Sequence, residues 1–400
     1  MKVTRLKTES FKIDEIAVFL TMPLDKETIT KNALIPAILR RGTSNLKSQL
    51  EIGRKLEEMY GAGFNCGIDK TGDYCVLKFY IETLSNKFLP NNENISQEAV
   101  KLIMDIIFNP LVVNNAFSEE YVKQEKENLE KVIKARKDNK ANYAYNRCLE
   151  EMFKDEPYGL FKYGYLEDLE KINAKNLYEY YKEMIKNCKI DVIINGVDAD
   201  ELEVPEVTEN LDNAIVMNEY KHTTSEIPKI IKESIDVQQG KLIIGMDAPT
   251  ENRYAVTMYN VVLGGGANSK LFQNVREKAS LAYSAGSSYL RRKNAVMIKT
   301  GIELQNYDKA LKIIEQQLED MKNGKITDDE IKAGRQLILA SLRMIPESQE
   351  DTIAFYFDQQ LFNENLTVDE YCKKLESVTK EQIVDVANKI RINTIYYLEK

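Results

Sequence analysis

The chain has 400 residues, 43% of them hydrophobic and 30% charged, which is typical of a soluble globular protein with two or three domains. Its 63 acidic and 55 basic residues give a net charge of −8, and without a concentrated basic stretch nucleic acid is not an expected partner. No segment approaches about 18 uninterrupted apolar residues and the N-terminus lacks an apolar signal core, so no membrane partner is expected and the predicted localisation is cytoplasmic.

The cysteine and histidine content limits metal and redox chemistry. The five cysteines have irregular spacings and no Cys-x-x-Cys pair, which predicts scattered buried thiols. They are Cys66, Cys75, Cys148, Cys188 and Cys372. The single histidine, His222, is predicted to be a solvated loop residue. Mechanisms that need two histidines from this chain are therefore excluded.

Hydrophobic periodicity predicts alternating strands and helices in the first half of the chain. The expected strands cover residues 16–20, 75–81 and 190–194, and the expected helices cover 46–59, 97–108, 118–137 and 177–185. Gly61-Ala62-Gly63 ends the first of these helices, because glycine tolerates the backbone angles of a C-cap. Pro110 ends the second, because proline disfavours helix in the residue before it.

An acidic, irregular stretch separates the two halves. Residues 198–225 contain Val204-Pro205-Glu206-Val207 and are typical of a crossing linker. The predicted domains are therefore 1–197 and 226–400. The second is expected to open with a strand over 241–245 and a helix over 253–263.

The two halves resemble each other. Gly42-Thr43-Ser44 precedes a predicted helix, a small-residue turn and a strand that ends at Ile81-Glu82. Gly266-Ala267-Asn268 precedes the same series, which ends at Ile302-Glu303, roughly 220 residues further on. This weak repeat predicts two domains of one α/β design.

A specific resemblance begins at the triple glycine. Residues 263–284 read LGGGANSKLFQNVREKASLAYS and resemble the C-terminal domain signature of the pitrilysin/insulinase family of zinc peptidases. The resemblance extends over nearly the whole chain. It implies an α+β fold of two homologous mixed α/β domains, the metallohydrolase fold of pitrilysin and mitochondrial processing peptidase.

In that family the first domain carries an inverted zinc motif, His-x-x-Glu-His, followed by a Gly-Thr pair. Here Gly42-Thr43 is present, but Ala33 and Ala37 stand at the two histidine places. Pro36 stands at the place of the general-base glutamate and is expected to interrupt any helix that would direct two ligands at one ion.

The third zinc ligand of the family is a glutamate on a later acidic helix, seven residues beyond a first glutamate. Residues 125–132, EKENLEKV, resemble that helix and put Val132 at the ligand place. Methyl groups cannot hold zinc or activate its water. The resemblance therefore implies no metal, no cofactor and no enzymatic activity of the chain on its own.

The family also uses an arginine and a tyrosine, seven residues apart, to hydrogen-bond the substrate carbonyl and the oxyanion. Arg276 and Tyr283 match this spacing. Such donors stabilise the charge that develops in the transition state, and removing one typically costs about 3 kcal/mol. Taken as isolated residues, Arg276 would be a solvated helix residue and Tyr283 a core aromatic.

Some family members work as pairs of homologous chains, one with the zinc motif and one with the Arg/Tyr pair. This chain resembles the second kind, and in particular small bacterial members associated with 5-aminopentanol modification of elongation factor P. The expected function is a non-catalytic subunit of a heterodimeric peptidase that binds a peptide or protein substrate for a zinc-bearing homologous partner. A structural scaffold, or a subunit for maturation of peptides such as bacteriocins, remains an alternative.

Overall fold

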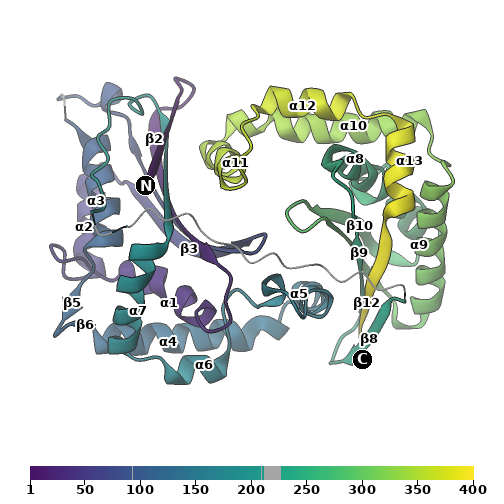
Figure 1. Cartoon of the computed structure of the whole chain (residues 1–400), viewed down its shortest axis with the longest axis horizontal. Coiled ribbons are helices and arrows are strands. Elements are labelled where there is room, and N and C mark those ends of the chain that lie inside the picture. The colour runs from purple at the N-terminus through teal and green to yellow at the C-terminus, as the bar shows by residue number, and fades with distance from the viewer. Residues whose placement is uncertain (92, 209, 211–226) are drawn as a thin grey trace. The chain divides into compact units, whose positions relative to one another are not determined.

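The computed structural model describes residues 1–91, 93–208, 210 and 227–400, which form two compact units (Figure 1). Unit 1 contains Met1–Ala135, the described part of Leu160–Glu219, and Ile345–Asn365. Unit 2 contains Arg136–Gly159, the described part of Tyr220–Met344, and Leu366–Lys400. The predicted domains, divided by one linker at 198–225, keep each half of the chain together. In the structure, residues 136–159 of the first half belong to unit 2, and residues 345–365 of the second half belong to unit 1. His222 and most of that linker lie outside the described residues.

Unit 1 is built on a five-stranded sheet of order β1-β7-β2-β4-β3, in which β1 and β7 are parallel and the other neighbours antiparallel. Its strands are β1 (Lys2–Lys7), β2 (Ile13–Pro23), β3 (Gly63–Thr71), β4 (Tyr74–Leu84) and β7 (Lys189–Gly196), beside the short hairpin of β5 (Val112–Val113) and β6 (Ala116–Phe117). Its helices are α1 (Ile29–Leu39), α2 (Gln49–Glu58), α3 (Ile95–Phe108), α4 (Glu119–Lys134), α6 (Leu166–Lys171), α7 (Ala174–Asn187) and α11 (Gln349–Leu361).

Unit 2 has a second five-stranded sheet, of order β10-β11-β9-β12-β8. Its strands are β8 (Lys229–Ser234), β9 (Gly240–Asp247), β10 (Ala282–Leu290), β11 (Ala295–Ile302) and β12 (Arg391–Glu399). Its helices are α5 (Lys140–Met152), α8 (Arg253–Gly264), a π-helix (Phe272–Lys278), α9 (Tyr307–Lys322), α10 (Asp328–Arg343), α12 (Val368–Glu376) and α13 (Lys380–Lys389).

The two sheets have the same topology. In chain order, β8, β9, β10, β11 and β12 take the places of β1, β2, β3, β4 and β7, and the parallel pair β8–β12 corresponds to β1–β7. A short 3₁₀-helix follows the corresponding strand in each unit, Asn86–Phe88 after β4 and Leu304–Asn306 after β11. The predicted internal repeat and the α+β fold of two homologous halves are confirmed.

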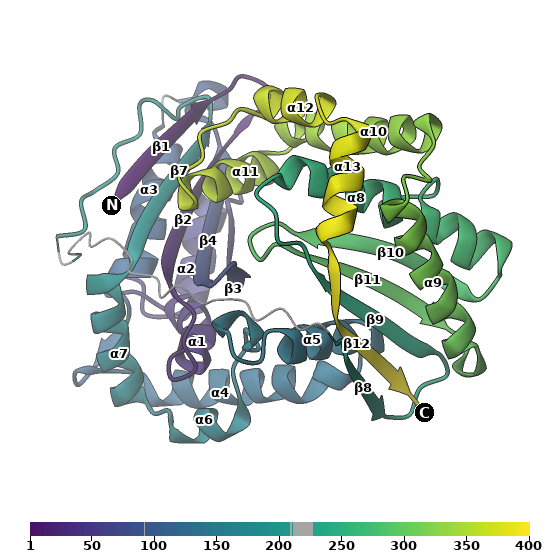
Figure 2. The same ribbon diagram turned by 45° about the vertical axis from the view of Figure 1, so that its right-hand side comes forward.

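The exchanged segments occupy corresponding places in the two halves. Helix α11 packs on β2 and β7 of unit 1, where Phe357 stacks on Phe19 with ring centroids 3.9 Å apart. Figures 1 and 2 show α11 and α3 on opposite faces of this sheet. Helix α5 packs on β9 and β12 of unit 2. Each half of the chain thus supplies one helix that covers the sheet of the other half.

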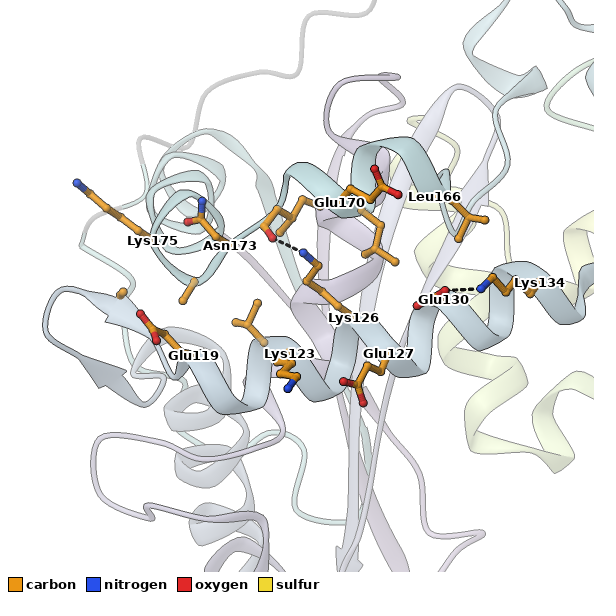
Figure 3. Close-up of a pocket in the computed structure, with 15 residues that line it drawn as sticks. Glu119, Lys123, Lys126, Glu127, Glu130, Lys134, Leu166, Glu170, Asn173 and Lys175 are labelled. Carbon is orange, nitrogen blue, oxygen red and sulfur yellow. Dashed lines mark hydrogen bonds and ion pairs between the residues drawn. The ribbon is translucent and has the colours of Figure 1, made fainter.

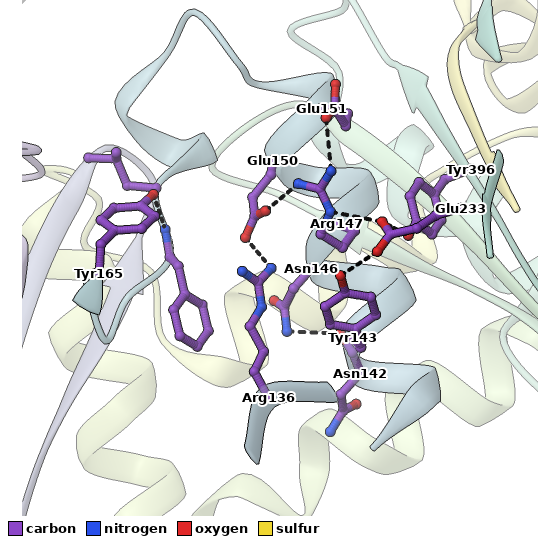
Figure 4. Close-up of polar contacts among 12 residues, drawn as sticks. Arg136, Asn142, Tyr143, Asn146, Arg147, Glu150, Glu151, Tyr165, Glu233 and Tyr396 are labelled. Carbon is purple, nitrogen blue, oxygen red and sulfur yellow. Dashed lines mark hydrogen bonds and ion pairs between the residues drawn. The ribbon is translucent and has the colours of Figure 1, made fainter. Parts of the chain in front are cut away.

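A polar network fixes α5 to the strands of unit 2 (Figure 4). The carboxylate of Glu233 on β8 accepts hydrogen bonds from the hydroxyls of Tyr143 at 2.5 Å and Tyr396 at 2.6 Å, and from Nε of Arg147 at 3.2 Å. The apolar side of α5 contacts β9 at Gly245, where an added Cβ would lie 2.5 Å from the sulfur of Met152. Glycine at this position therefore permits the close approach of helix and strand.

The strands and helices predicted from periodicity are all present, with ends that differ by a few residues. The expected effect of Pro36 is wrong, because α1 runs through it to Leu39. The Pro36 carbonyl accepts hydrogen bonds from the Arg40 backbone N–H and from the Cys66 thiol, both at 3.3 Å. These contacts beyond the proline support the last turn, so the loss of one N–H does not end the helix.

Candidate functional site

The three residues that the resemblance assigns to a zinc motif, Ala33, Pro36 and Ala37, lie on one face of α1. Because α1 is continuous, Ala33 and Ala37 are one turn apart and line the same cavity, together with Pro36. This cavity has a volume of about 420 Å³, and β3 and α4 supply other parts of its lining. Side chains at positions 33 and 37 can therefore reach one point, but the two methyl groups present there cannot ligate a metal ion.

An ion pair, not a metal-ligand set, occupies the α4 side of this cavity. Glu125 is 9% exposed, and its Oε1 accepts a 2.6 Å hydrogen bond from Nε of Arg41 and also contacts Nη2 of the same guanidinium. Its Oε2 accepts from the side-chain amide of Asn128 at 3.2 Å. The Arg41 guanidinium also lies over the ring of Tyr121, 5.4 Å from its centroid. Both carboxylate oxygens of Glu125 therefore have fixed donors.

Val132 is on the same helix as Glu125 but does not line this cavity, and 45% of it is exposed. Alanine and valine side chains have no atom that can ligate a metal, so Ala33, Ala37 and Val132 do not fit a zinc ion. Across residues 1–91, 93–208, 210 and 227–400, no three His, Cys, Asp or Glu side chains are grouped so that they could hold a metal ion.

Arg276 and Tyr283 lie in unit 2 on two adjacent irregularities of the backbone. Arg276 belongs to the π-helix, and Tyr283 occupies a bulge where the register of β10 against β11 shifts between Ala282 and Ser284. The π-helix packs against β10. Single π turns and β-bulges are frequent at functional sites, because they redirect side chains that a regular element would point elsewhere.

The side chains of both residues are accessible. Tyr283 is 79% exposed, which is incompatible with the alternative reading as a core aromatic. The Arg276 side chain is 44% exposed, and its guanidinium lies 4.5 Å from the centroid of the Phe272 ring, with Glu277 at 3.7 Å. A guanidinium and a phenol are thus presented at the surface on neighbouring elements of unit 2.

A larger cavity of about 750 Å³ lies on another side of α4, facing α6 and the start of α7 (Figure 3). Its lining shares no residue with the cavity at Ala33. Its lining contains four lysines and four glutamates beside apolar side chains. Two of the lysines are already bonded within the protein, since Lys126 donates to the Ile172 carbonyl and Lys134 donates to Glu130. The balanced charge favours no class of ligand.

Arg41 and Asn128 were not predicted from the sequence as site residues. Glu125 entered the prediction only as the first glutamate, from which the position of Val132 was counted. A signal was present in the adjacent pair Arg40-Arg41 at the end of α1, because basic side chains at a helix C-terminus commonly find acceptors nearby. The partner on α4 is more than 80 residues away in the chain and could not be assigned without the fold.

The fold and this cavity define the class of protein: two homologous α+β units, in which the cavity at Ala33 and Ala37 presents no set of metal ligands among the described residues. A family model described as "Peptidase M16 inactive domain" matches residues 171–338. The "Probable inactive metalloprotease YmfF" of Bacillus subtilis is 32% identical over 402 residues, which cover 98% of this chain and 94% of that relative. The chain belongs to the M16 peptidase family, the pitrilysin/insulinase family of the sequence analysis, as an inactive homologue.

Other proteins share the sequence pattern or the fold. The "Uncharacterized zinc protease YmxG" of Bacillus subtilis is 22% identical and covers 73% of this chain and 72% of its own length. A crystal structure of a conserved protein from Enterococcus faecalis is 25% identical, with a TM-score of 0.91 over 99% of this chain and 95% of that one. A protease from Helicobacter pylori, 17% identical, shares the fold with a TM-score of 0.82 over 100% and 96% of the two chains.

Every helix in the described ranges is too short or too polar to span a lipid bilayer.

Proposed function

We propose that this chain is the Arg/Tyr-bearing, non-catalytic subunit of a heterodimeric M16-type peptidase, and that it binds and orients a peptide or protein substrate for a zinc-bearing homologous partner. The observation that carries the proposal is the contrast between the two parts of the family's site. The zinc places hold Ala33, Ala37 and Val132, whereas Tyr283 and Arg276 remain accessible on a bulge and a π-helix.

The chemistry divides between the two chains. The partner supplies the metal and the general base, which activate water. This chain supplies Arg276 and Tyr283, whose guanidinium and phenol donate hydrogen bonds to the substrate carbonyl oxygen as negative charge develops on it. Donors of this kind act mainly on turnover, because the charge they meet is greater in the transition state than in the bound substrate.

The test is peptidase activity of the purified chain alone, of its coexpressed zinc-bearing homologue alone, and of the pair. Activity should require the pair. Arg276→Ala should lower kcat/KM of the pair by about 100-fold, and Tyr283→Phe by about 10-fold or more, as for other oxyanion donors. Activity of the lone chain, or a pair indifferent to both substitutions, would overturn the proposal.

Matched controls separate catalysis from assembly. Arg343→Ala removes an exposed arginine from α10, and Tyr60→Phe removes an exposed hydroxyl that bonds to Glu93. Both should leave kcat unchanged. If Tyr283→Phe affects only association of the two chains and not turnover of the assembled pair, the chain is a structural scaffold.

The pathway part of the proposal is modification of elongation factor P, supported by the resemblance to bacterial members associated with that process. Deleting the gene should remove the 5-aminopentanol group from elongation factor P, as measured by the intact mass of the factor. Complementation with Arg276→Ala should not restore it. Normal modification in the deletion strain would favour another substrate, such as a bacteriocin precursor.

A further inference from the structure

The cavity at Ala33 and Ala37 is polar and open, although it cannot hold zinc. We propose that this cavity binds a carboxylate group of a peptide, either its C-terminus or an acidic side chain. The proposal rests on the proposed function for the peptide nature of the ligand. The site itself lies wholly in unit 1 and involves neither Arg276 nor Tyr283.

The cavity carries a net positive charge. Its charged lining residues are Arg40, Arg41 and Glu125, which leave one net positive charge. Glu125 is already satisfied by Arg41 and Asn128, so its carboxylate has little capacity left for a ligand cation. A carboxylate entering the cavity would supply the acceptors that the remaining donors need.

Arg40 is the cation that would meet this group. It follows Leu39 at the C-terminal end of α1, its side chain is exposed, and in the described part of the chain it has no ion-pair partner. Arg40 is one of the residues that line the cavity, together with Cys66 on β3. Arginine binds carboxylates with directed, charge-assisted hydrogen bonds.

The other walls suit a neutral or anionic ligand. Burial raises the pKa of the Cys66 thiol to about 11, so the thiol stays neutral and does not repel an anion. Arg41 is held by Glu125 and Tyr121, which preorganises the positive edge of the cavity. The volume of about 420 Å³ falls within the usual range of small-ligand pockets and accommodates one peptide end or side chain.

The small side chains of Ala33 and Ala37 leave room for the proposed carboxylate. At these places histidine rings would fill the space, whereas the methyl groups leave the cavity open beside Arg40. A larger side chain at Ala37 should therefore block the cavity without altering its charge. This gives two independent ways to remove the site, one through Arg40 and one through Ala37.

The experiment uses the immobilised full chain without its partner and one pool that combines equal amounts of a randomised tetrapeptide library with free C-termini and the same library as C-terminal amides. Mass spectrometry of the retained peptides measures enrichment over the input. Carboxylate-bearing peptides should be enriched by about 10-fold, the effect of one charge-assisted hydrogen bond. Enrichment of the free acids over amides of the same sequence identifies the C-terminus, and enrichment of Asp or Glu in both acids and amides identifies an acidic side chain.

Arg40→Gln and Ala37→Leu should each abolish the enrichment, while Arg343→Gln, at an exposed arginine of unit 2, should leave it unchanged. The thermal midpoint of each variant confirms that it is folded. No enrichment of either carboxylate, or enrichment that survives either substitution in a folded variant, overturns the proposal. Because no partner and no turnover are involved, this failure is distinct from indifference of the assembled pair to Arg276→Ala, which concerns the proposed function alone.

Discussion

The guanidinium of Arg41 and the carboxylate of Glu125 form an ion pair at the cavity lined by Ala33 and Ala37. Nε of Arg41 donates to Oε1 at 2.6 Å, and both side chains are largely buried. The positive charge that faces Glu125 is therefore that of an arginine side chain. It stabilises the contact between α1 and α4 without zinc.

Replacing Arg41 with glutamine should destabilise unit 1. The substitution leaves the buried Glu125 carboxylate with only the Asn128 amide as a donor, and an uncompensated buried charge is costly. We expect the free energy of unfolding to fall by about 2 kcal/mol, measured by urea denaturation. The double variant Arg41→Gln/Glu125→Gln should recover part of this loss. A single variant as stable as the unsubstituted chain would contradict the pairing.

The stability of unit 1 should decline as the pH rises, in part because of Glu15. Burial raises the pKa of Glu15 from its ordinary value of 4.5 to about 7, and the charges of Glu350 and Glu82 add to the rise. Folding therefore takes up a proton between these pH values. The stability contributed by the neutral carboxyl is fully present below pH 4.5 and is lost as the pH rises through 7.

The measurement is urea unfolding of the chain and of Glu15→Gln at about pH 5 and about pH 8. The unsubstituted chain should lose up to about 3 kcal/mol more than the variant between these conditions. Asp14, whose pKa burial raises to about 6, acts in the same direction in both proteins and cancels in the comparison. Equal losses in the two proteins would show that Glu15 does not titrate in this range.

The attachment of α5 to unit 2 should depend on Glu233. Glu233→Gln removes the charge that Arg147 faces and weakens two hydrogen bonds from tyrosine hydroxyls, so α5 should open more often. Amide hydrogen exchange in residues 140–152 should become faster by about 10-fold, while exchange in 349–361 stays the same. Lys229→Gln, which removes one exposed ion pair with Glu151, should have little effect. Equal acceleration in both helices would indicate general destabilisation instead.

The stacking of Phe357 on Phe19 should make α11 an essential part of unit 1. Phe357→Ala empties a buried position in the cluster with Ala17 and Ile193 and should cost about 3–4 kcal/mol. Phe355→Ala, on the same helix but only half-buried, should cost clearly less. Thermal or urea unfolding gives both values. Similar losses for the two variants would mean that α11 is not docked through Phe357.

Much of the fold could be predicted because its signals are local. The apolar run in residues 16–20, the alternation in 75–81 and the helical spacing in 97–108 report the burial of β2, β4 and α3 directly. The repeat was detectable because corresponding glycines and strand ends survive in both halves. Helices and strands whose apolar residues recur at the spacing of that element can be predicted from the sequence alone.

The sequence could not predict that α5 and α11 each pack on the sheet of the other half of the chain. The pattern of apolar residues in a helix indicates which face is buried, but not which sheet covers it. Pro36 misled for a related reason: its local helix-breaking tendency is offset by contacts from Arg40 and by the thiol of Cys66, which is distant in the sequence. The cavity at Ala33 could be located from the motif. Its lining by Arg41, Glu125 and Asn128 depends on how α1 meets α4, which requires the tertiary structure.

Metal analysis and peptide hydrolysis by the isolated, extensively washed chain test the central claim most directly. Aliphatic and proline side chains at the three ligand places and the base place should leave zinc far below one ion per chain, with no hydrolysis of unstructured peptides. A stoichiometric zinc ion whose removal by a chelator abolishes hydrolytic turnover would contradict the account.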